Sequence, residues 1–335
     1  MRAIELRQFG LEGLQSVVRE VPVPAAGQVR LRMRAASLNY HDLVTVLGVA
    51  NPRLPLPVVP LSDGCGVVEA IGEGVTRFRV GDRVTTLFFS DWMAGEPTRQ
   101  RLARVPGEHV DGVLADCMAM EANGLVAVPD YLSDEEAATL PCAALTAWRS
   151  VVVEAKVKAG DTVLLQGTGG VSLFALQFAK MLGATTIITS GSEAKLEKLA
   201  ALAPDHTINY RETPDWARRV KDITGGRGVD HVVEVGGAGT LQQSLKALRI
   251  GGHISMIGVL TGVANVVPTA LIMALNATVK GITVGSRDDA EAMCRAMAAH
   301  QLRPVIGERF GFAEAPAAFA CMQQAAHFGK IVIRH

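Results

Sequence analysis

The sequence predicts a protein of the α/β class, in which a β-rich part precedes a doubly wound domain with a parallel sheet. A strand, a glycine turn and an apolar helix follow one another over Thr162–Lys180. Strands and helices alternate from about residue 160 onward, which is typical of parallel sheets with right-handed crossovers. Short alternating segments, separated by Pro and Gly, fill residues 1–80, as expected for a β-rich fold.

The glycine turn reads GTGGVS over residues 167–172. Gly167 allows a tight turn, Gly169 lets the backbone approach a phosphate, and Ser172 takes a third position that is usually Gly. Helix N-termini leave N–H groups unpaired and carry partial positive charge, so a pyrophosphate can bind there. We therefore expect a dinucleotide site at Gly167, Gly169, Gly170 and Val171. A generic strand-to-helix turn is the alternative.

The β-rich part contains the expected strands Ala3–Leu6, Val29–Ala35 and Gly66–Ile71, with helical spacing over Asn39–Leu47. Residues 86–112 follow without a regular pattern. They cluster the aromatic side chains Phe88, Phe89 and Trp92 among glycines and prolines. Long aromatic loops often cover substrates, so these rings are expected to line an apolar substrate mouth. A loop packed on the domain surface is an equal alternative.

A helical pattern begins at Ser133, which has Glu136 three residues later as a capping box requires. It continues to about Ala155. The strands expected after it are Thr162–Gln166, Thr185–Thr189, Thr207–Asn209, His231–Glu234, Gly252–Ile257 and Val279–Val284. The chain is then expected to close with a helix over Asp288–His300, a strand over Arg309–Gly311, a helix over Glu314–Gln324 and a strand over Lys330–Ile333.

Composition narrows the function classes. The chain has 335 residues, 49% of them hydrophobic, and equal numbers of basic and acidic residues, 33 each. A net charge of zero argues against nucleic acid or an anionic membrane as the main partner, and we expect a small-molecule substrate. Five scattered cysteines without a CxxC pair, and no signal-peptide pattern, indicate a reduced cytoplasmic protein.

Several motifs together resemble the medium-chain dehydrogenase/reductase superfamily over nearly the whole chain. They include PVVPLSDGCGVVEAIGEGV (57–75), VGDRV (80–84), EEAATLPCAALTAW (135–148), GTGGVS (167–172), HTINYRE (206–212) and GKIVI (329–333). The resemblance implies a GroES-like catalytic domain over 1–130 and 284–335. A Rossmann domain that binds NAD(P) would be inserted between these segments, over 131–283.

The zinc-binding pattern of the superfamily is broken in this chain. Zinc alcohol dehydrogenases of the superfamily use Cys, His and Cys as ligands, and these positions fall at Asn39, Ser62 and Cys142. One soft ligand of three does not make a tetrahedral zinc site. The four-cysteine structural zinc lobe is also absent, because Cys117 stands alone. No zinc is therefore expected. An improvised site from His41, Asp42, Asp63 and Cys142 is a remote alternative.

The pair Asn39-Tyr40 resembles the zinc-independent quinone oxidoreductase branch, in which both residues lie beside the nicotinamide and the substrate. His41 follows, at a position where zinc alcohol dehydrogenases carry a hydroxyl that relays the substrate proton. A histidine can relay a proton near neutral pH. The resemblance therefore implies Asn39, Tyr40 and His41 as catalytic residues. A His41 that caps its helix or faces solvent is the alternative.

The end of the second strand of the Rossmann pattern indicates the cofactor. NAD sites usually place Asp or Glu there to bind the ribose 2′-hydroxyl, but this chain has Ser190 and Ser192, with Lys195 nearby. Hydroxyls and a lysine suit a 2′-phosphate, and Tyr210 resembles the tyrosine that closes over this phosphate in quinone oxidoreductases. NADPH is therefore expected. NAD remains the alternative if Glu193 turns onto the ribose.

The resemblance places further cofactor contacts at the ends of later strands and in the C-terminal tail. These residues are Thr146, Gly236, Ile257, Gly258, Val259, Gly329 and Lys330. The expected reaction is hydride transfer from NADPH to a quinone or an α,β-unsaturated carbonyl. Such acceptors delocalise the negative charge and need less electrophilic help than an isolated ketone. The alternatives are a zinc-free alcohol dehydrogenase or carbonyl reductase and, further off, a non-catalytic NADPH sensor.

The segment Val279–Val284 is expected to form the edge of the Rossmann sheet. In the superfamily this edge pairs across a two-fold axis, and exposed edges are normally covered. The sequence therefore predicts a homodimer.

Overall fold

The structure is a computed structural model that describes residues 1–335, and it divides into two compact units. Unit 1 comprises Met1–Leu145 with Val284–His335, and unit 2 comprises Thr146–Thr283. The expected domain boundaries are 131 and 284, and the chain passes from one unit to the other after Leu145 and after Thr283. None of the helices is long and apolar enough to cross a membrane.

The stretch 131–145 belongs to unit 1 because its polar groups are bonded to strands of that unit. Arg83 donates to Leu132 O (2.7 Å), and the Thr85 hydroxyl donates to Ala137 O (3.2 Å). The backbone N–H of Cys142 donates to the Asp63 carboxylate (3.0 Å). The sequence showed a helical pattern here but not which sheet it packs on.

Unit 1 is built on strands. They are β1 (Arg2–Leu6), β2 (Leu14–Val18), β3 (Gln28–Leu38), β4 (Asp63–Ile71), β5 (Arg83–Thr86), β6 (Cys117–Glu121), β7 (Leu125–Ala127), β14 (Ile306–Gly311) and β15 (Lys330–Arg334). Its helices are α1 (Tyr40–Val46), α2 (Asp134–Ala138), the π-helix η3 (Leu140–Ala144), α9 (Arg287–His300), α10 (Ala315–Gln323) and the short turns η1 (Leu11–Gly13), η2 (Ala122–Gly124) and η6 (Phe312–Glu314).

The main sheet of unit 1 has the order β14-β15-β3-β4-β5-β7, with β6 paired to β3 and a separate β1-β2 hairpin. β15 pairs with β3 so that Ile331 lies opposite Leu38, and β3 pairs with β4 so that Ser37 lies opposite Asp63. This register brings Lys330 and Asp63 to the end of β3, where α1 begins.

Helix α3 (Leu145–Trp148) leads from unit 1 into unit 2 and is followed by the π-helix η4 (Arg149–Glu154). The helical stretch predicted from Ser133 to about Ala155 is confirmed. Its strands are β8 (Thr162–Gln166), β9 (Thr185–Ser190), β10 (His206–Asn209), β11 (Val229–Glu234), β12 (Leu248–Met256) and β13 (Thr278–Gly281). Its further helices are α4 (Gly170–Met181), α5 (Glu193–Leu199), η5 (Ala200–Leu202), α6 (Trp216–Ile223), α7 (Leu241–Ala247) and α8 (Thr269–Ala274).

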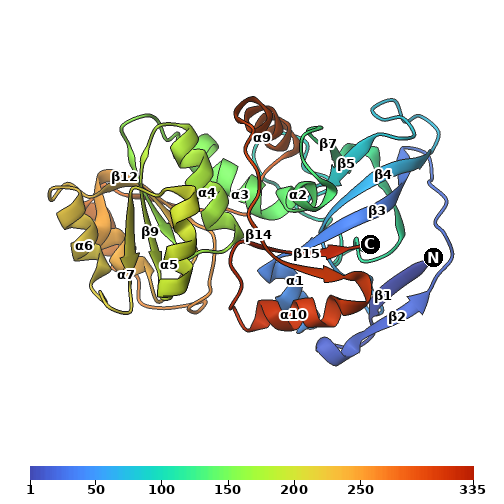
Figure 1. The fold of residues 1–335 in the computed structure, drawn as a ribbon, viewed down its shortest axis with the longest axis horizontal. Helices are drawn as coiled ribbons and strands as arrows, with labels where there is room; N and C mark the ends of the chain where they lie inside the picture. The colour runs from blue at the N-terminus through green and yellow to red at the C-terminus, as the bar shows by residue number, and fades with distance from the viewer. The chain divides into compact units, whose positions relative to one another are not determined.

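All six strands of unit 2 are parallel and follow the order β10-β9-β8-β11-β12-β13, with helices on both sides of the sheet (Figure 1). The predicted doubly wound domain is confirmed. β13 ends at Gly281, earlier than expected, and Val284, the last residue of the expected strand, has φ 48°, outside the extended region. The strand order reverses between β8 and β11. Ligands of open α/β sheets bind beyond the carboxyl ends of the strands at such a point.

Candidate functional site

The predicted dinucleotide turn lies directly beyond the carboxyl end of β8. Gly167 has φ 72°, and Gly169 is the N-cap of the twelve-residue helix α4. A Cβ built on either glycine meets no heavy atom within 4 Å. The space beside the turn is therefore open to a ligand, and the N-terminus of α4 lies there with its unpaired N–H groups. Gly170 and Val171 form the first turn of this helix.

A buried network supports the turn from behind. The Gln166 side chain donates to Glu234 (2.7 Å), and its carbonyl oxygen accepts from the N–H of Gly236 (3.2 Å). The Glu234 carboxylate also accepts from the N–H groups of Gly236 and Gly237, both at 2.9 Å. The ends of β8 and β11 are thus locked together. The sequence did not mark Gln166 or Glu234 as functional. A usable signal was the carboxylate of Glu234, which follows two apolar residues at the end of β11.

The residues predicted for a 2′-phosphate lie beyond β9. Ser190 ends β9, and Ser192 is the N-cap of α5, which carries Lys195. The ring of Tyr210 covers Gly191 so closely that a Cβ there would lie 2.6 Å from it. Tyr210 N–H also donates to Ser190 O (3.1 Å). Two strands therefore bring the serines and the tyrosine together at one edge of the sheet.

Glu193 is the carboxylate that could have bound a ribose hydroxyl in place of these residues. Its Oε2 accepts a hydrogen bond from the side chain of Asn209 at 3.0 Å, and Asn209 also donates to Glu212 at 3.0 Å. The structure therefore ties Glu193 to β10 rather than leaving it beside the serines.

The remaining cofactor positions in unit 2 also follow strand ends. Ile257 N–H (2.8 Å) and Gly258 N–H (3.2 Å) donate to Glu234 O, and a Cβ on Gly258 would lie 2.2 Å from Val235 O. Only glycine fits there. Val259 is 46% exposed, and Thr146 lies buried in α3. That they contact a cofactor stays a prediction.

The predicted catalytic residues begin α1 in unit 1. Asn39 is its N-cap, and its N–H donates to Asp42 (2.8 Å) in a capping box. Tyr40 is 46% exposed, whereas Asn39 is 6% exposed. Tyr40 is therefore the most exposed of the predicted catalytic residues, while Asn39 is directed into the unit.

His41 has a carboxylate partner that the sequence did not reveal. Its Nε2 lies 3.2 Å from Glu108 Oε2, and its ring meets Phe88 edge-on at 5.0 Å between centroids. Burial lowers the pKa of His41, but the hydrogen bond with Glu108 and the charges of Asp42, Glu108 and Asp63 outweigh this, so its pKa is raised. His41 neither caps the helix nor points freely into solvent. No motif marked Glu108, since it lies in the irregular loop.

The three aromatic residues predicted to line a substrate mouth are buried: Phe88 is 5%, Phe89 8% and Trp92 2% exposed. They form a chain of ring contacts, Phe88 to Phe89 at 4.8 Å and Phe89 to Trp92 at 6.1 Å between centroids. Trp92 Nε1–H donates to Gly95 O (2.8 Å). Phe89 and Trp92 are buried by packing within the unit. Of the three rings, Phe88 is the one that contacts a predicted catalytic side chain, His41. A role in substrate binding stays a prediction.

The C-terminal tail places Lys330 inside unit 1. Its Nζ donates to Leu38 O and to Asn39 Oδ1, both at 2.6 Å. Gly329 has φ 72°, and a Cβ there would lie 2.4 Å from Val305 O. Glycine is therefore required for the chain to enter β15. Contact of either residue with a cofactor stays a prediction.

The residues at the zinc-ligand positions do not fit a zinc ion. Asn39 Oδ1 is 2.6 Å from the Lys330 ammonium, and the Ser62 hydroxyl donates to Asp63 (2.9 Å). Of the three positions only Cys142 has a thiol. No group of three or more His, Cys, Asp or Glu side chains is arranged to hold a metal ion. A cation beside the ammonium would also meet like charge.

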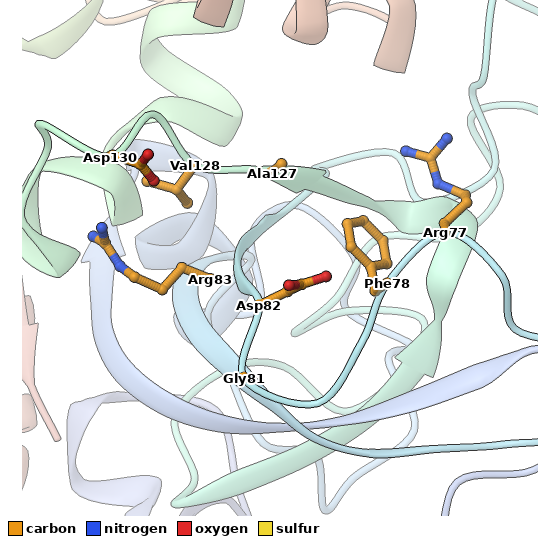
Figure 2. A pocket seen from close by; sticks show the side chains of 8 residues that line it. All are labelled: Arg77, Phe78, Gly81, Asp82, Arg83, Ala127, Val128 and Asp130. Atoms are coloured by element: carbon orange, nitrogen blue, oxygen red, sulfur yellow. The ribbon is translucent and has the colours of Figure 1, made fainter.

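Two shallow hollows lie elsewhere on unit 1. Figure 2 shows the larger one, of about 380 Å³, between the arms of Arg77 and Arg83. Both guanidinium groups are already engaged, Arg77 with Glu291 (3.0 Å) and Arg83 with Asp134 (2.9 Å). The smaller hollow, of about 320 Å³, is lined by Ser90, Asp91, Met93, Arg104, Glu121 and Asn123. Neither contains a predicted site residue.

Two family models match the sequence. Residues 25–130 match the alcohol dehydrogenase GroES-like domain, and residues 170–299 match the zinc-binding dehydrogenase model. The matched ranges correspond to the β-rich part and to the parallel-sheet part described above.

Curated relatives extend the similarity over the whole chain. A zinc-type alcohol dehydrogenase-like protein of Schizosaccharomyces pombe is 41% identical over 97% of this chain and 96% of its own length. The acryloyl-coenzyme A reductase of Metallosphaera sedula is 31% identical over 94% of this chain and 95% of its own. Among solved structures, an NAD-dependent alcohol dehydrogenase superposes with a TM-score of 0.92 at 36% identity and covers 100% of both chains.

Proposed function

Since the chain belongs to the medium-chain dehydrogenase/reductase superfamily and is an NAD(P)H-dependent oxidoreductase, we propose that it is a zinc-independent reductase of conjugated carbonyls or quinones that uses NADPH. The observation that carries the proposal is the set of side chains at the three zinc-ligand positions, Asn39, Ser62 and Cys142. Where a metal would polarise a carbonyl, the chain has a carboxamide bonded to Lys330, a hydroxyl bonded to Asp63 and one thiol.

Such a site suits an acceptor that spreads its own charge. A metal Lewis acid supplies several kcal/mol to a developing alkoxide, whereas one hydrogen-bond donor supplies about 3 kcal/mol. The bound nicotinamide supplies the hydride. An enone or quinone then becomes an enolate or hydroquinone anion, whose charge is delocalised. The name of the acryloyl-coenzyme A reductase, a relative over nearly the whole chain, supports an acceptor of this class.

The residues of α1 supply the donors. The exposed Tyr40 hydroxyl is placed to donate to the oxygen that becomes negative. His41, whose pKa is raised through its hydrogen bond with Glu108, can give a proton to the product. Proton delivery through Tyr40 or water is the alternative route. Asn39 holds the turn from inside the unit.

NADPH is favoured by the end of β9. Ser190, Ser192 and Lys195 offer two hydroxyls and a positive charge, and Tyr210 covers the backbone between the serines. The one carboxylate nearby, Glu193, is engaged by Asn209. A 2′-phosphate thus finds donors where a free ribose hydroxyl would find no carboxylate acceptor.

The test is steady-state oxidation of NADPH and NADH with a small quinone and with 2-cyclohexenone, in the presence of a metal chelator. We expect turnover with NADPH at least tenfold faster in kcat/KM than with NADH. Tyr40→Phe and His41→Ala should each lower kcat/KM by roughly 100-fold, and Tyr131→Phe, in the same unit, should not. Absence of turnover with both acceptors, or loss of turnover on chelation, would overturn the proposal.

Matched variants on α5 test the phosphate site by itself. Lys195→Met should raise the KM for NADPH by about tenfold, as expected for loss of one charge-assisted contact, and leave that for NADH unchanged. Lys198→Met removes a lysine from the same helix one turn later and should change neither. Equal effects of the two variants on NADPH would remove Lys195 from the site.

An alcohol dehydrogenase is the second candidate, favoured by the names of the relative at 41% identity and of the solved structure at TM-score 0.92. It would oxidise an alcohol reversibly in the presence of the chelator and leave quinone and enone untouched.

We also propose that the chain forms a homodimer through β13, which is an edge of the six-stranded sheet. Apolar side chains are exposed along the preceding segment, at Val259, Leu260, Val263, Val266, Val267 and Met273. An uncovered edge next to such a surface favours pairing with a second copy. A monomer in light scattering at micromolar concentration would contradict this.

A further inference from the structure

Lys330 is unusual for unit 1 in both kind and place. It is the only lysine of the unit, whose other long basic side chains are all arginines. It is 4% exposed. Lysines are almost never fully buried unless they are paired, so the position calls for a partner. A compact ammonium with three donors suits a small polar interior better than a planar guanidinium does.

Two buried carboxylates lie in the same interior. Asp42 is 4% and Asp63 0% exposed. Asp42 accepts from Asn39 N–H (2.8 Å) and Ser62 N–H (3.1 Å), and Asp63 accepts from the Ser62 hydroxyl (2.9 Å) and Cys142 N–H (3.0 Å). These donors satisfy the oxygens but bring no full positive charge. Burial raises the pKa values of both groups. The charge of Lys330 acts against that rise at Asp63, and at Asp42 the charges of His41 and, less strongly, Lys330 do so.

The Asn39 carboxamide links the cation to the carboxylate. Lys330 can only donate, so the amide atom 2.6 Å from its Nζ must be the oxygen. The amide Nδ2 then faces Ser62 Oγ at 3.4 Å, and the Ser62 hydroxyl donates a hydrogen bond to Asp63. Asn39 therefore lies as a dipole between an ammonium and a carboxylate, with its orientation fixed by both.

Asn39 is also the N-cap of α1, whose first residues are Tyr40 and His41. Asp42 closes the capping box of the same turn and holds Ser62 N–H. The first turn of α1 is thus attached to the buried charges at two residues, Asn39 and Asp42.

We propose that Lys330 is an internal counter-cation and a positioning residue: its ammonium balances Asp42 and Asp63 and, through Asn39, fixes the turn that presents Tyr40 and His41. It acts from behind the site and does not bind the cofactor. The kcat and NADPH readouts below rest on the proposed function, whereas the melting temperatures and the NMR signals of His41 do not.

Four proteins test this: Lys330→Met, Asp63→Asn, the double variant and, as a control, Arg334→Met, which removes an exposed cation from the same strand. We expect Lys330→Met to lower the melting temperature and to lower kcat at least tenfold. Its Kd for NADPH, measured by fluorescence, should stay within twofold of wild type. Adding Asp63→Asn should restore most of both losses, because it removes the uncompensated carboxylate. Arg334→Met should behave as wild type.

A direct cofactor contact gives the opposite pattern. Lys330→Met would then raise the Kd for NADPH tenfold or more, and Asp63→Asn would not repair it. A double variant no better than Lys330→Met in melting temperature and kcat also overturns the proposal. If Lys330→Met does not fold, a folded double variant supports the counter-cation and an unfolded one overturns it.

The result is separable from the proposed function. If no acceptor is turned over and NADPH does not bind, the melting temperatures and the NMR signals of the His41 ring still decide. The His41 signals should move in Lys330→Met and return in the double variant, since the ring is carried by the turn that Lys330 holds.

Discussion

Asp63 in unit 1 and Glu234 in unit 2 are both fully buried carboxylates at strand ends, yet they are stabilised differently. Glu234 accepts from five neutral donors: Gly236 N–H, Gly237 N–H, Thr240 hydroxyl, Gln166 amide and Ser244 hydroxyl. Asp63 accepts from the Ser62 hydroxyl and Cys142 N–H, and depends on the charge of Lys330.

The difference shows two ways of fixing a loop with a buried anion. Around Glu234 the donors are the backbone and side chains of the loops that are being fixed, so the carboxylate orders the turn by geometry. Around Asp63 a cation from a distant strand offsets the charge, and the order of α1 depends on a charge balance. Neutral isosteres should therefore affect the two sites unequally.

The largest effect is expected for Glu234→Gln. An amide keeps one acceptor oxygen but turns an NH2 group toward donors, which leaves buried N–H and O–H groups unsatisfied at about 1–3 kcal/mol each. We expect unit 2 to lose about 3 kcal/mol of unfolding free energy and the Kd for NADPH to rise. Urea unfolding followed by Trp148 and Trp216 fluorescence, in a Trp92→Phe background, measures the loss. Asp63→Asn, as the matched isostere in unit 1, should cost less. Equal losses of unfolding free energy in Glu234→Gln and Asp63→Asn would show that the two carboxylates are not stabilised differently.

The same two sites differ in how much of their structure could be predicted from the sequence. The strands β8 and β11, the glycine turn and the capping box at Ser133 were predictable, because apolar periodicity and small residues at fixed offsets are local signals. The link between Gln166 and Glu234 and the pair His41–Glu108 were not. They join residues 68 and 67 positions apart, and nothing local encodes which loop residue meets which side chain.

The place where unit 1 gives way to unit 2, after Leu145, also depends on contacts between distant residues. The helical pattern from Ser133 was correct, but its attachment to β4 and β5 depends on hydrogen bonds such as Thr85 to Ala137 O. Lys330 was predicted from a resemblance as a cofactor contact. Its burial against Asn39 follows only from the pairing of β15 with β3.

The next effect in size is a pH dependence at Asp63. Burial raises its pKa to about 6 against the opposing charge of Lys330, and an unfolded Asp has a pKa of about 3.9. A raised folded pKa means that the native state binds the proton more tightly. This contribution to stability is complete below pH ~4 and is lost as the pH rises through about 6, about 3 kcal/mol.

Asp63→Asn removes this titration, so its unfolding free energy relative to wild type should improve between pH 4 and pH 7. Trp92 is the only tryptophan of unit 1, and a Trp148→Phe, Trp216→Phe background lets urea unfolding report that unit. A constant difference between the two proteins across this pH range would show that Asp63 keeps an ordinary pKa.

A smaller effect is expected at Glu108, whose carboxylate is only partly covered and pairs with a single ring. Glu108→Gln should lower the pKa of His41, because the hydrogen bond and charge of Glu108 are what raise it above its usual value against burial. NMR titration of the His41 ring measures the change, and kcat/KM at neutral pH should fall by about tenfold, ~1.4 kcal/mol. His109→Asn removes a second ring near Glu108 (3.8 Å) and should leave the pKa of His41 raised. An unchanged His41 titration in Glu108→Gln would show that Glu108 does not raise the pKa of His41.

The smallest effect is expected at Ser172, which takes the third glycine position of the turn. Its hydroxyl donates to Gln166 O at 2.6 Å inside the network behind the turn. Ser172→Ala removes one neutral hydrogen bond, so unit 2 should lose about 1 kcal/mol, and the Kd for NADPH should stay within twofold. Because the Gln166 side chain still bonds Glu234 and the N–H of Gly236 behind the turn, one lost hydroxyl should not displace it. A tenfold weaker Kd in Ser172→Ala would mean instead that the turn depends on each bond singly, and the contrast with the charge-balanced site in unit 1 would not hold.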